Sequence, residues 1–177
     1  PVWDAVADAM TEQTADAAVD RAQLLGIPAA VAVAAAPVRR VVTRDGGPTR
    51  RDAGLVVDLS ALWAGPLCAR LVGAVTGAQV VKVEDPTRPD GARVGSPTFW
   101  QRLNGAKEDV SIELGTDGGR RALAALLHDA DVVVTSARPR ALNALGLRPA
   151  DHAARGTVWV AVTGYGLTGR SQTQRVE

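Results

Sequence analysis

The residues best suited to chemistry stand in one turn, which runs from Asp58 to Pro66 after the apolar segment Leu55–Leu59. In a sheet of parallel strands, such a strand-to-helix turn is where helix amides bind the phosphates of a ligand. A dinucleotide site requires the pattern G-x-G-x-x-G, whose glycines let the backbone approach a pyrophosphate. This turn has only Gly65, and Pro66 has no amide hydrogen. The sequence therefore argues against an NAD-binding domain.

Trp63, in the same turn, is unusual because aromatic residues make up only 3% of the chain. Two interpretations stay open for this side chain. It is either a core or interface residue, or a flat wall against a bound group.

Metal chemistry and thiol chemistry are not supported by the sequence. His128 and His152 are the only histidines, and they are too far apart to form a metal-binding pair on one helix. Cys68 falls in a segment with helical apolar periodicity, which is typical of a packed thiol rather than a nucleophile. We expect no bound metal.

Composition restricts the class of protein. The chain has 177 residues, of which 46% are hydrophobic and 22% charged, which suffices for one globular domain with a core. A formal net charge of +1 gives no strong attraction for a polyanion, so we expect no nucleic-acid partner. The longest apolar run, residues 27–38, is shorter than the roughly 20 residues that a membrane helix needs, so we expect no membrane partner. The single cysteine predicts a cytoplasmic location.

The elements that must position the turn follow from the pattern of residues 53–177. Apolar runs predict strands over residues 55–59, 79–83, 110–114, 132–134 and 157–162, and helices are predicted from Gly65 to a stop at Gly77, over 117–128, and as a short helix or turn over 139–145. Apolar strands that alternate with helices form parallel sheets with helices on both faces. Right-handed crossovers then give a Rossmann-like α/β fold.

The residues before this segment divide into two parts. Residues 1–37 are predicted to be helical, with Thr14 capping a helix over 15–25 that stops at Gly26. Residues 38–52 are rich in arginine and glycine, and they form either a linker, which we favour, or a basic patch for phosphate. Because the chain begins at Pro1 rather than at methionine, we expect it to be part of a longer protein.

Five segments of the chain resemble, in order, the motifs of the class III CoA-transferases, the family of formyl-CoA transferase, carnitine CoA-transferase and the bile-acid-inducible F group. They are Leu55–Ser60 with Ala64–Pro66, Gly77–Glu84, Asn104–Leu114 with Gly119–Arg120, Ala130–Val134 with Arg138–Pro139, and Thr163–Gly166 with Thr168–Gly169. The resemblance implies that residues 53–177 form an incomplete CoA-binding domain. Gly26–Val31 resembles the end of the family's small domain, so residues 1–37 would be the tail of such a domain.

The resemblance also implies a reaction. These enzymes transfer coenzyme A between carboxylic acids through an aspartyl-CoA intermediate, and two subunits interlock as a homodimer. The substrates would be an acyl-CoA and a carboxylic acid acceptor. By the family's spacing the nucleophilic Asp lies beyond Glu177, so we expect this chain to be a fragment that is inactive alone.

Carried over residue by residue, the family's CoA contacts fall on seven positions. They are Trp63 and Ala64 in the first turn, Ile112 on a later strand, Ser136, Ala137 and Arg138 after the next strand, and Arg175 near the end of the chain. The arginines are suited to phosphate, which a guanidinium binds through two parallel hydrogen bonds.

Other positions depart from the family pattern. Asp85 replaces an Arg, Glu108–Asp109 replaces Arg-Ser, and Thr135–Ala137 replaces Glu-Asn-Phe. These changes leave a second hypothesis open, a non-catalytic binding or assembly module related to the enzymes. An acyl-CoA racemase is less well supported, because the place of its catalytic His is held by Glu177 or lies beyond it.

Overall fold

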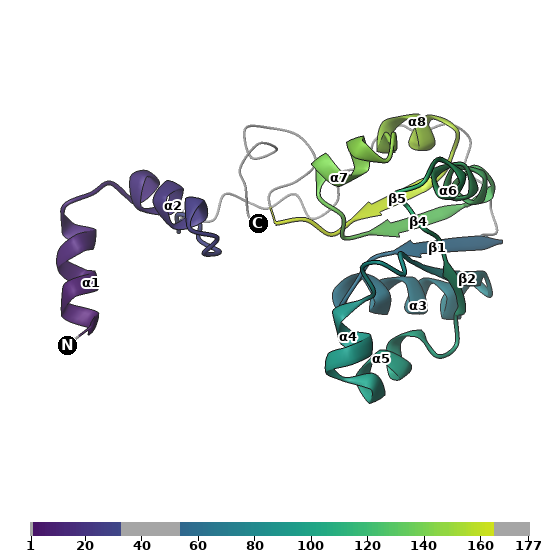
Figure 1. Ribbon diagram of the computed structural model, residues 1–177, viewed down its shortest axis with the longest axis horizontal. Coiled ribbons are helices and arrows are strands. Elements are labelled where there is room, and N and C mark those ends of the chain that lie inside the picture. Colours follow the sequence, from purple (N-terminus) through teal and green to yellow (C-terminus); the bar gives the residue numbers. More distant parts are fainter. Residues whose placement is uncertain (1, 33–53, 165–177) are drawn as a thin grey trace. The chain divides into compact units, whose positions relative to one another are not determined.

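A computed structural model describes residues 2–32 and 54–164, which belong to two separate compact units (Figure 1). The first unit holds helices α1 (Val2–Thr11) and α2 (Ala15–Leu24). The Thr14 hydroxyl accepts a hydrogen bond of 3.2 Å from the Ala17 amide and so caps α2. Gly26 has a φ of 74° and stops it. The predicted cap and stop are confirmed, and the predicted linker 38–52 lies outside the described residues.

Strands within residues 54–164 form one sheet. They are β1 (Leu55–Leu59), β2 (Gln79–Glu84), β3 (Glu108–Ser111), β4 (Val132–Thr135) and β5 (Val158–Ala161), in the order β3-β2-β1-β4-β5. All four pairings between neighbouring strands of this sheet are parallel. The predicted Rossmann-like α/β fold is confirmed (Figure 1).

Helices cover both faces of the sheet because alternate strand residues point to opposite sides. On one face, Val56, Val132 and Val134 pack with Ala69 of α3 (Ala64–Thr76), and α5 (Pro97–Asn104) lies beside α3. On the other face, Val57, Val81 and Val133 pack with Leu123 and Leu127 of α6 (Asp117–Asp129) and with Leu142 of α7 (Pro139–Ala144). The short helices α4 (Gly91–Gly95) and α8 (Pro149–Ala154) pack against α5 and β5 respectively.

The sequence predicts no helix between residues 83 and 110, but Asp90 caps α4 by accepting from the Ala92 amide at 2.9 Å, and Pro97 opens α5. Both helices are too short for clear periodicity. The strand expected over 110–114 occupies 108–111 instead, because the Leu114 amide donates to the Asp85 carboxylate at 3.2 Å rather than to a neighbouring strand.

The connections of the sheet change direction at the carboxyl ends of β1 and β4. The β1–β2 crossover passes through α3 on one face, and the β3–β4 crossover passes through α6 on the other. The connections that follow β1 and β4 therefore diverge from adjacent strands. In open α/β sheets, ligands bind at the carboxyl ends of the strands at such a point.

Close packing of α3 on β2 yields a stability prediction. A Cβ at Gly73 would lie 2.3 Å from Cγ2 of Val80. Alanine's better helix propensity would by itself add up to about 1 kcal/mol of stability. We expect Gly73→Ala to lower the free energy of unfolding by about 1–3 kcal/mol, because overpacking dominates. Gly95→Ala is the control, since nothing lies within 4 Å of its Cβ. Equal unfolding midpoints in urea for the two variants would contradict this packing.

Candidate functional site

The β1–α3 turn, residues 60–63, is held in an unusual conformation at the carboxyl end of β1. Leu62 has a φ of 69°, in the left-handed region that residues with a Cβ rarely adopt. Its amide donates to both carboxylate oxygens of Asp90 at 3.1 Å. The Ala61 amide donates to Oγ of Ser136 at 3.0 Å, which ties the turn to the residue after β4. The turn is therefore fixed to two neighbouring connections.

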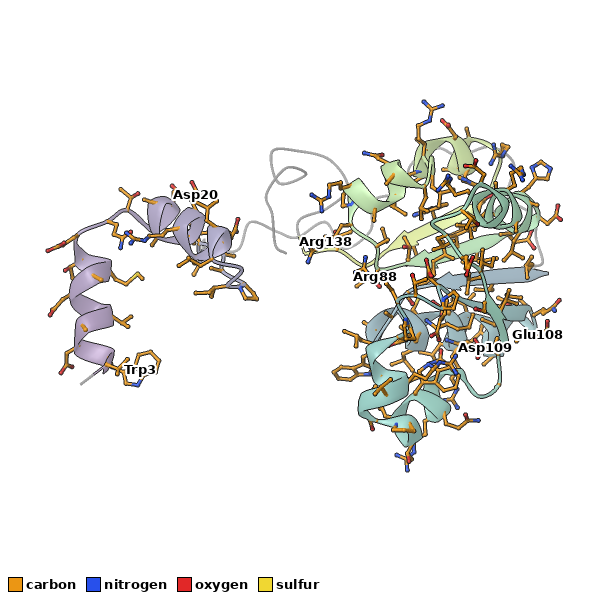
Figure 2. The ribbon with its side chains drawn as sticks, in the orientation of Figure 1. Trp3, Asp20, Arg88, Glu108, Asp109 and Arg138 are labelled. Carbon is orange, nitrogen blue, oxygen red and sulfur yellow. The ribbon has the colours of Figure 1, made fainter. Side chains whose placement is uncertain are left out.

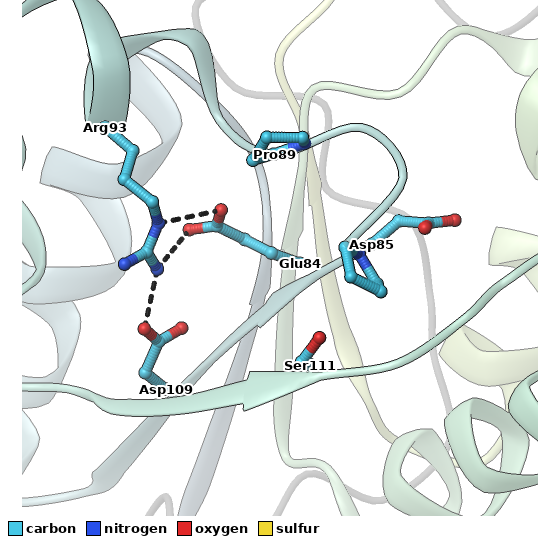
Figure 3. A pocket seen from close by; sticks show the side chains of 7 residues that line it. Glu84, Asp85, Pro89, Arg93, Asp109 and Ser111 are labelled. Atoms are coloured by element: carbon cyan, nitrogen blue, oxygen red, sulfur yellow. Dashed lines mark hydrogen bonds and ion pairs between the residues drawn. The ribbon is translucent and has the colours of Figure 1, made fainter.

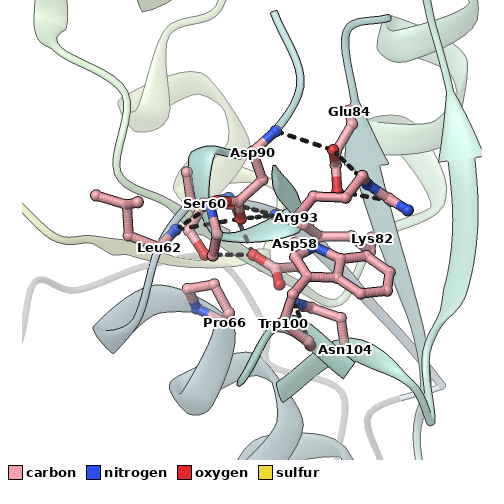
Figure 4. Close-up of polar contacts among 12 residues, drawn as sticks. Asp58, Ser60, Leu62, Pro66, Lys82, Glu84, Asp90, Arg93, Trp100 and Asn104 are labelled. Carbon is pink, nitrogen blue, oxygen red and sulfur yellow. Dashed lines mark hydrogen bonds and ion pairs between the residues drawn. The ribbon is translucent and has the colours of Figure 1, made fainter. Parts of the chain in front are cut away.

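Charged side chains lie directly beneath this turn (Figure 4). Asp58 and Lys82 are register partners on β1 and β2, and both are buried on the face that α3 covers. One Asp58 oxygen accepts from the amide of Ser60 at 2.9 Å and also from its hydroxyl. The Lys82 ammonium donates to the Ser60 carbonyl. The first residue of the turn is thus held through its amide, its hydroxyl and its carbonyl.

Lys107 completes the pairing of Asp58. Its ammonium lies 2.7 Å from the second Asp58 oxygen, and these side chains are 2% and 0% exposed. The same ammonium donates to the Pro66 carbonyl at 2.8 Å and to Oδ1 of Asn104 at 2.8 Å. Burial lowers the pKa of Lys107, and the charge of Asp58 opposes that shift.

Asp90 pairs with the other lysine. Its carboxylate lies 3.5 Å from the Lys82 ammonium, and both side chains are 1% exposed. Asp58, Lys82, Asp90 and Lys107, the buried ionic network, thus hold two negative and two positive charges. A buried charge is tolerated only where it is paired and hydrogen-bonded, and each member meets that condition.

A second ionic cluster extends from the network towards solvent. Arg93 donates to both oxygens of Glu84, at 3.2 and 3.0 Å, and to Asp109 at 2.6 Å (Figure 3). Its guanidinium also stacks on the Trp100 ring, 3.8 Å from the centroid. Burial would raise the pKa of Glu84, but hydrogen bonds from Arg93 and the Asp90 amide, with the charge of Lys82, outweigh it and lower that pKa.

A cavity of about 290 Å³ opens beside this cluster (Figure 3). The charged residues of its lining are mostly acidic, and the lining comprises Glu84, Asp85, Pro86, Pro89, Arg93, Asp109 and Ser111. Because Arg93 is already bound to two carboxylates, the cavity offers no free cation among its lining residues. It is therefore poorly suited to a phosphate.

Some of the predicted contact residues gather around the turn. Trp63 is 64% exposed just before α3, and Ala64, the first residue of α3, is exposed too. Ser136 is half-buried and is bonded to the turn through the Ala61 amide. Trp63 is therefore not a core side chain of this unit, which leaves the binding and interface interpretations.

The remaining predicted contact residues are less closely associated with the β1–α3 turn. Ala137 is half-buried, and its amide donates to the Thr135 hydroxyl at 3.0 Å. Arg138 is exposed at the start of α7 (Figure 2). Ile112 does not reach the turn, since its side chain is 8% exposed in the core cluster with α6. Arg175 lies outside the described residues.

Sequence reasoning missed the buried ionic network. The signal was present, because Lys82 and Asp58 each interrupt an otherwise apolar strand, and a charge in a buried strand requires a partner. The identity of the partners depends on strand register, which the sequence does not display.

The acidic residues that depart from the family pattern have local structural roles. Asp85 accepts from the amide and hydroxyl of Thr87 at 2.9 and 2.7 Å and from the Leu114 amide. The Thr87 bonds are the main cause of a lowered pKa for Asp85. Asp109 pairs with Arg93. These carboxylates are therefore occupied within the fold.

Within residues 2–32 and 54–164, no cluster of three or more histidine, cysteine or carboxylate side chains suited to a metal ion occurs. No helix in this part of the chain is both long enough and apolar enough to cross a membrane.

Comparison with known proteins identifies the class. Residues 53–176 match the model of CoA-transferase family III. The chain therefore belongs to this family, and the resemblance found in the sequence motifs is confirmed.

The chain is similar to two curated enzymes and to one solved structure. It is 35% identical over 127 residues to (R)-2-hydroxy-4-methylpentanoate CoA-transferase of Clostridioides difficile, covering 64% of this chain and 31% of that protein. It is 34% identical over 131 residues to succinyl-CoA--D-citramalate CoA-transferase of Chloroflexus aurantiacus, covering 69% and 32%. The crystal structure of the hypothetical protein Rv3272 from Mycobacterium tuberculosis matches with a TM-score of 0.59 at 32% identity, over 73% of this chain and 38% of that one. The chain thus spans about a third of the length of these proteins.

The pairing of Asp58 with Lys107 gives a second stability prediction. We expect Lys107→Met to lower the free energy of unfolding by about 3–5 kcal/mol, because it leaves a carboxylate buried without its cation. The control is Arg148→Met, which breaks an exposed pair with Asp151 and is expected to cost at most about 1 kcal/mol. Adding Asp58→Asn to Lys107→Met should recover part of the loss in a double-mutant cycle. If Lys107→Met and Arg148→Met lower the free energy of unfolding by the same amount, the buried pair is disproved.

The lowered pKa of Glu84 predicts a pH dependence. Its carboxyl has a folded-state pKa below the ordinary 4.5, so it contributes stability above pH 4.5 that is lost as the pH falls through the lower, folded value. In Arg93→Met the main cause of the lowering is removed, so acid unfolding should begin at a higher pH. Thermal unfolding between pH 3 and 7 measures this, with Arg121→Met on the exposed face of α6 as the control. Superimposable pH profiles for Arg93→Met and wild type would refute the assignment.

Proposed function

We propose that residues 53–177 form part of the CoA-binding domain of a CoA-transferase. The observation that carries the proposal is the β1–α3 turn, which lies at the carboxyl end of β1 where the connections of the sheet diverge, is bonded to Ser136 and exposes Trp63. Family membership supports coenzyme A as the molecule bound there. The two curated relatives are named as CoA-transferases, which supports an acyl-CoA and a carboxylic acid as substrates.

The residues around the turn fit parts of coenzyme A. The exposed Trp63 ring offers a flat surface for the adenine or the pantetheine arm. Arg138, exposed near the carboxyl end of β4, offers a guanidinium for a phosphate. Ser136 and Ala137 would contribute their backbone, and Arg175 a second cation. Ile112 would contribute its backbone only, since its side chain is in the core.

The rest of the reaction is assigned to polypeptide beyond this chain. The matched segment covers only about a third of the length of these relatives, which supports a fragment whose nucleophilic Asp, the residue that would form an aspartyl-CoA, lies after Glu177. Residues 1–37 would be the end of a small domain and residues 38–52 a linker. The parent enzyme would be a cytoplasmic homodimer, the location resting on the single cysteine.

A non-catalytic module is the second candidate, and specific residues favour it. Asp85 and Asp109 make the neighbouring cavity acidic, and Ala137 gives no aromatic surface. The coding sequence downstream of Glu177 separates the two candidates. An Asp at the family's spacing supports the enzyme, and its absence supports the module.

Arg138 gives the binding prediction. In the full chain, we expect Arg138→Ala to weaken coenzyme A binding by about 1–3 kcal/mol, measured by calorimetry, because a charge-assisted hydrogen bond to phosphate is lost. Arg140 is also exposed and lies two residues after Arg138, on α7. Arg140→Ala should bind coenzyme A as the wild type does.

Two results would count against the proposal. If Arg138→Ala and Arg140→Ala bind coenzyme A equally well, the role of Arg138 is wrong. If the wild-type chain is stabilised against heat by NAD and not by coenzyme A, the site is a dinucleotide site instead.

A further inference from the structure

We propose that Asp90 is a positioning residue for coenzyme A: its buried carboxylate holds Leu62 in the left-handed conformation that presents Trp63 and the start of α3 to the ligand. Asp90 belongs to none of the family motifs identified in the sequence. It lies 28 residues from Leu62 along the chain and does not line the exposed surface of the turn. The inference rests on the proposed function of that turn.

The conformation of Leu62 requires an external cause. A φ of 69° brings Cβ close to the following carbonyl, and such strain persists only where the surroundings enforce it. The Leu62 side chain is 60% exposed, so burial of the leucine does not compensate for the strain. Its backbone amide is instead bonded to Asp90, which accepts the amide proton on both oxygens. The strain is therefore balanced by that carboxylate.

Asp90 is itself fixed from several sides (Figure 4). Lys82 lies 3.5 Å from its carboxylate, and the Ala92 amide donates to it at 2.9 Å. Its backbone amide donates to Glu84 at 3.0 Å, and Glu84 is held in turn by Arg93. A charged acceptor forms stronger hydrogen bonds to amides than a neutral one does. A carboxylate held this firmly can keep the Leu62 amide in one position.

The turn has little freedom to relax in another direction. A Cβ at Gly65 would lie 2.2 Å from the Ser60 side chain, so the backbones of these two residues are already in close approach. The Ala61 amide is bonded to Ser136. Release of Leu62 would therefore reorient chiefly Leu62 and Trp63. A binding surface that is ordered before the ligand arrives loses less entropy on binding, so this arrangement favours affinity.

A rescue experiment on the full chain tests the inference, with coenzyme A as the probe and calorimetry well below the unfolding temperature as the readout. Asp90→Ala should raise the dissociation constant about tenfold, because leucine then relaxes to a negative φ. Adding Leu62→Gly should restore most of that affinity, since glycine adopts a positive φ without penalty. Leu62→Gly alone supplies the reference affinity against which this recovery is measured. A residue that only stabilised the fold would show no such recovery.

Asp90→Ala also leaves Lys82 without its partner, so a milder substitution at the same position is measured beside it. Asp90→Asn keeps an oxygen acceptor for the Leu62 amide and should bind with an affinity between those of wild type and Asp90→Ala. Wild-type affinity in Asp90→Ala and Asp90→Asn, or no recovery on adding Leu62→Gly to either, overturns the positioning role while leaving the proposed function standing. Absence of coenzyme A binding in the wild type overturns both.

Discussion

The burial of four charges beneath one turn is the constraint on which the rest of the structure depends. Asp58 and Lys82 point to the same face of the sheet because β1 and β2 pair in one register. A shift of one residue in either strand would turn that strand's charged side chain towards α6, into an apolar core that offers it no partner. Lys107 must then return from the end of α5 to neutralise Asp58. Sheet register, the placement of α5 and the shape of the turn are thus fixed together.

This constraint explains how a sheet with few chemically distinctive residues can form a specific site. The β1–α3 turn presents backbone groups and one exposed indole, and its buried bonds to Asp58, Lys82 and Asp90 decide how these are displayed. Charged pairs contribute little net stability compared with well-packed apolar residues, so their role here is conformational. Beyond the network, Arg93 links Glu84 to Asp109 and leaves the adjoining cavity acidic. Asp85 and Asp109, two of the carboxylates that depart from the family pattern, are therefore integrated into the fold.

Local sequence rules predicted most of the fold, because apolar runs and caps act over a few residues. Thr14 and Gly77 behave as the cap and the stop that their residue types indicate. Prediction failed where tertiary contacts decide, as at β3, which ends early because Asp85 bonds the Leu114 amide. Trp63 and Ser136 are proposed from the sequence as contact residues, and in the structure Trp63 lies in the β1–α3 turn and Ser136 is bonded to it. The residues that support the turn were not predicted, since Lys82 and Asp90 meet only after the chain has folded.

The central claim is that buried charges, and not the turn's own sequence, hold residues 60–63 in place. Amide hydrogen exchange of the wild-type chain tests it most directly, because the amides of Ser60, Ala61 and Leu62 all donate to side chains of the fold. The account predicts that these three amides exchange much more slowly than an unstructured reference peptide, although Ala61 and Leu62 are exposed residues. Exchange of the Leu62 amide at the rate of a free loop would contradict it.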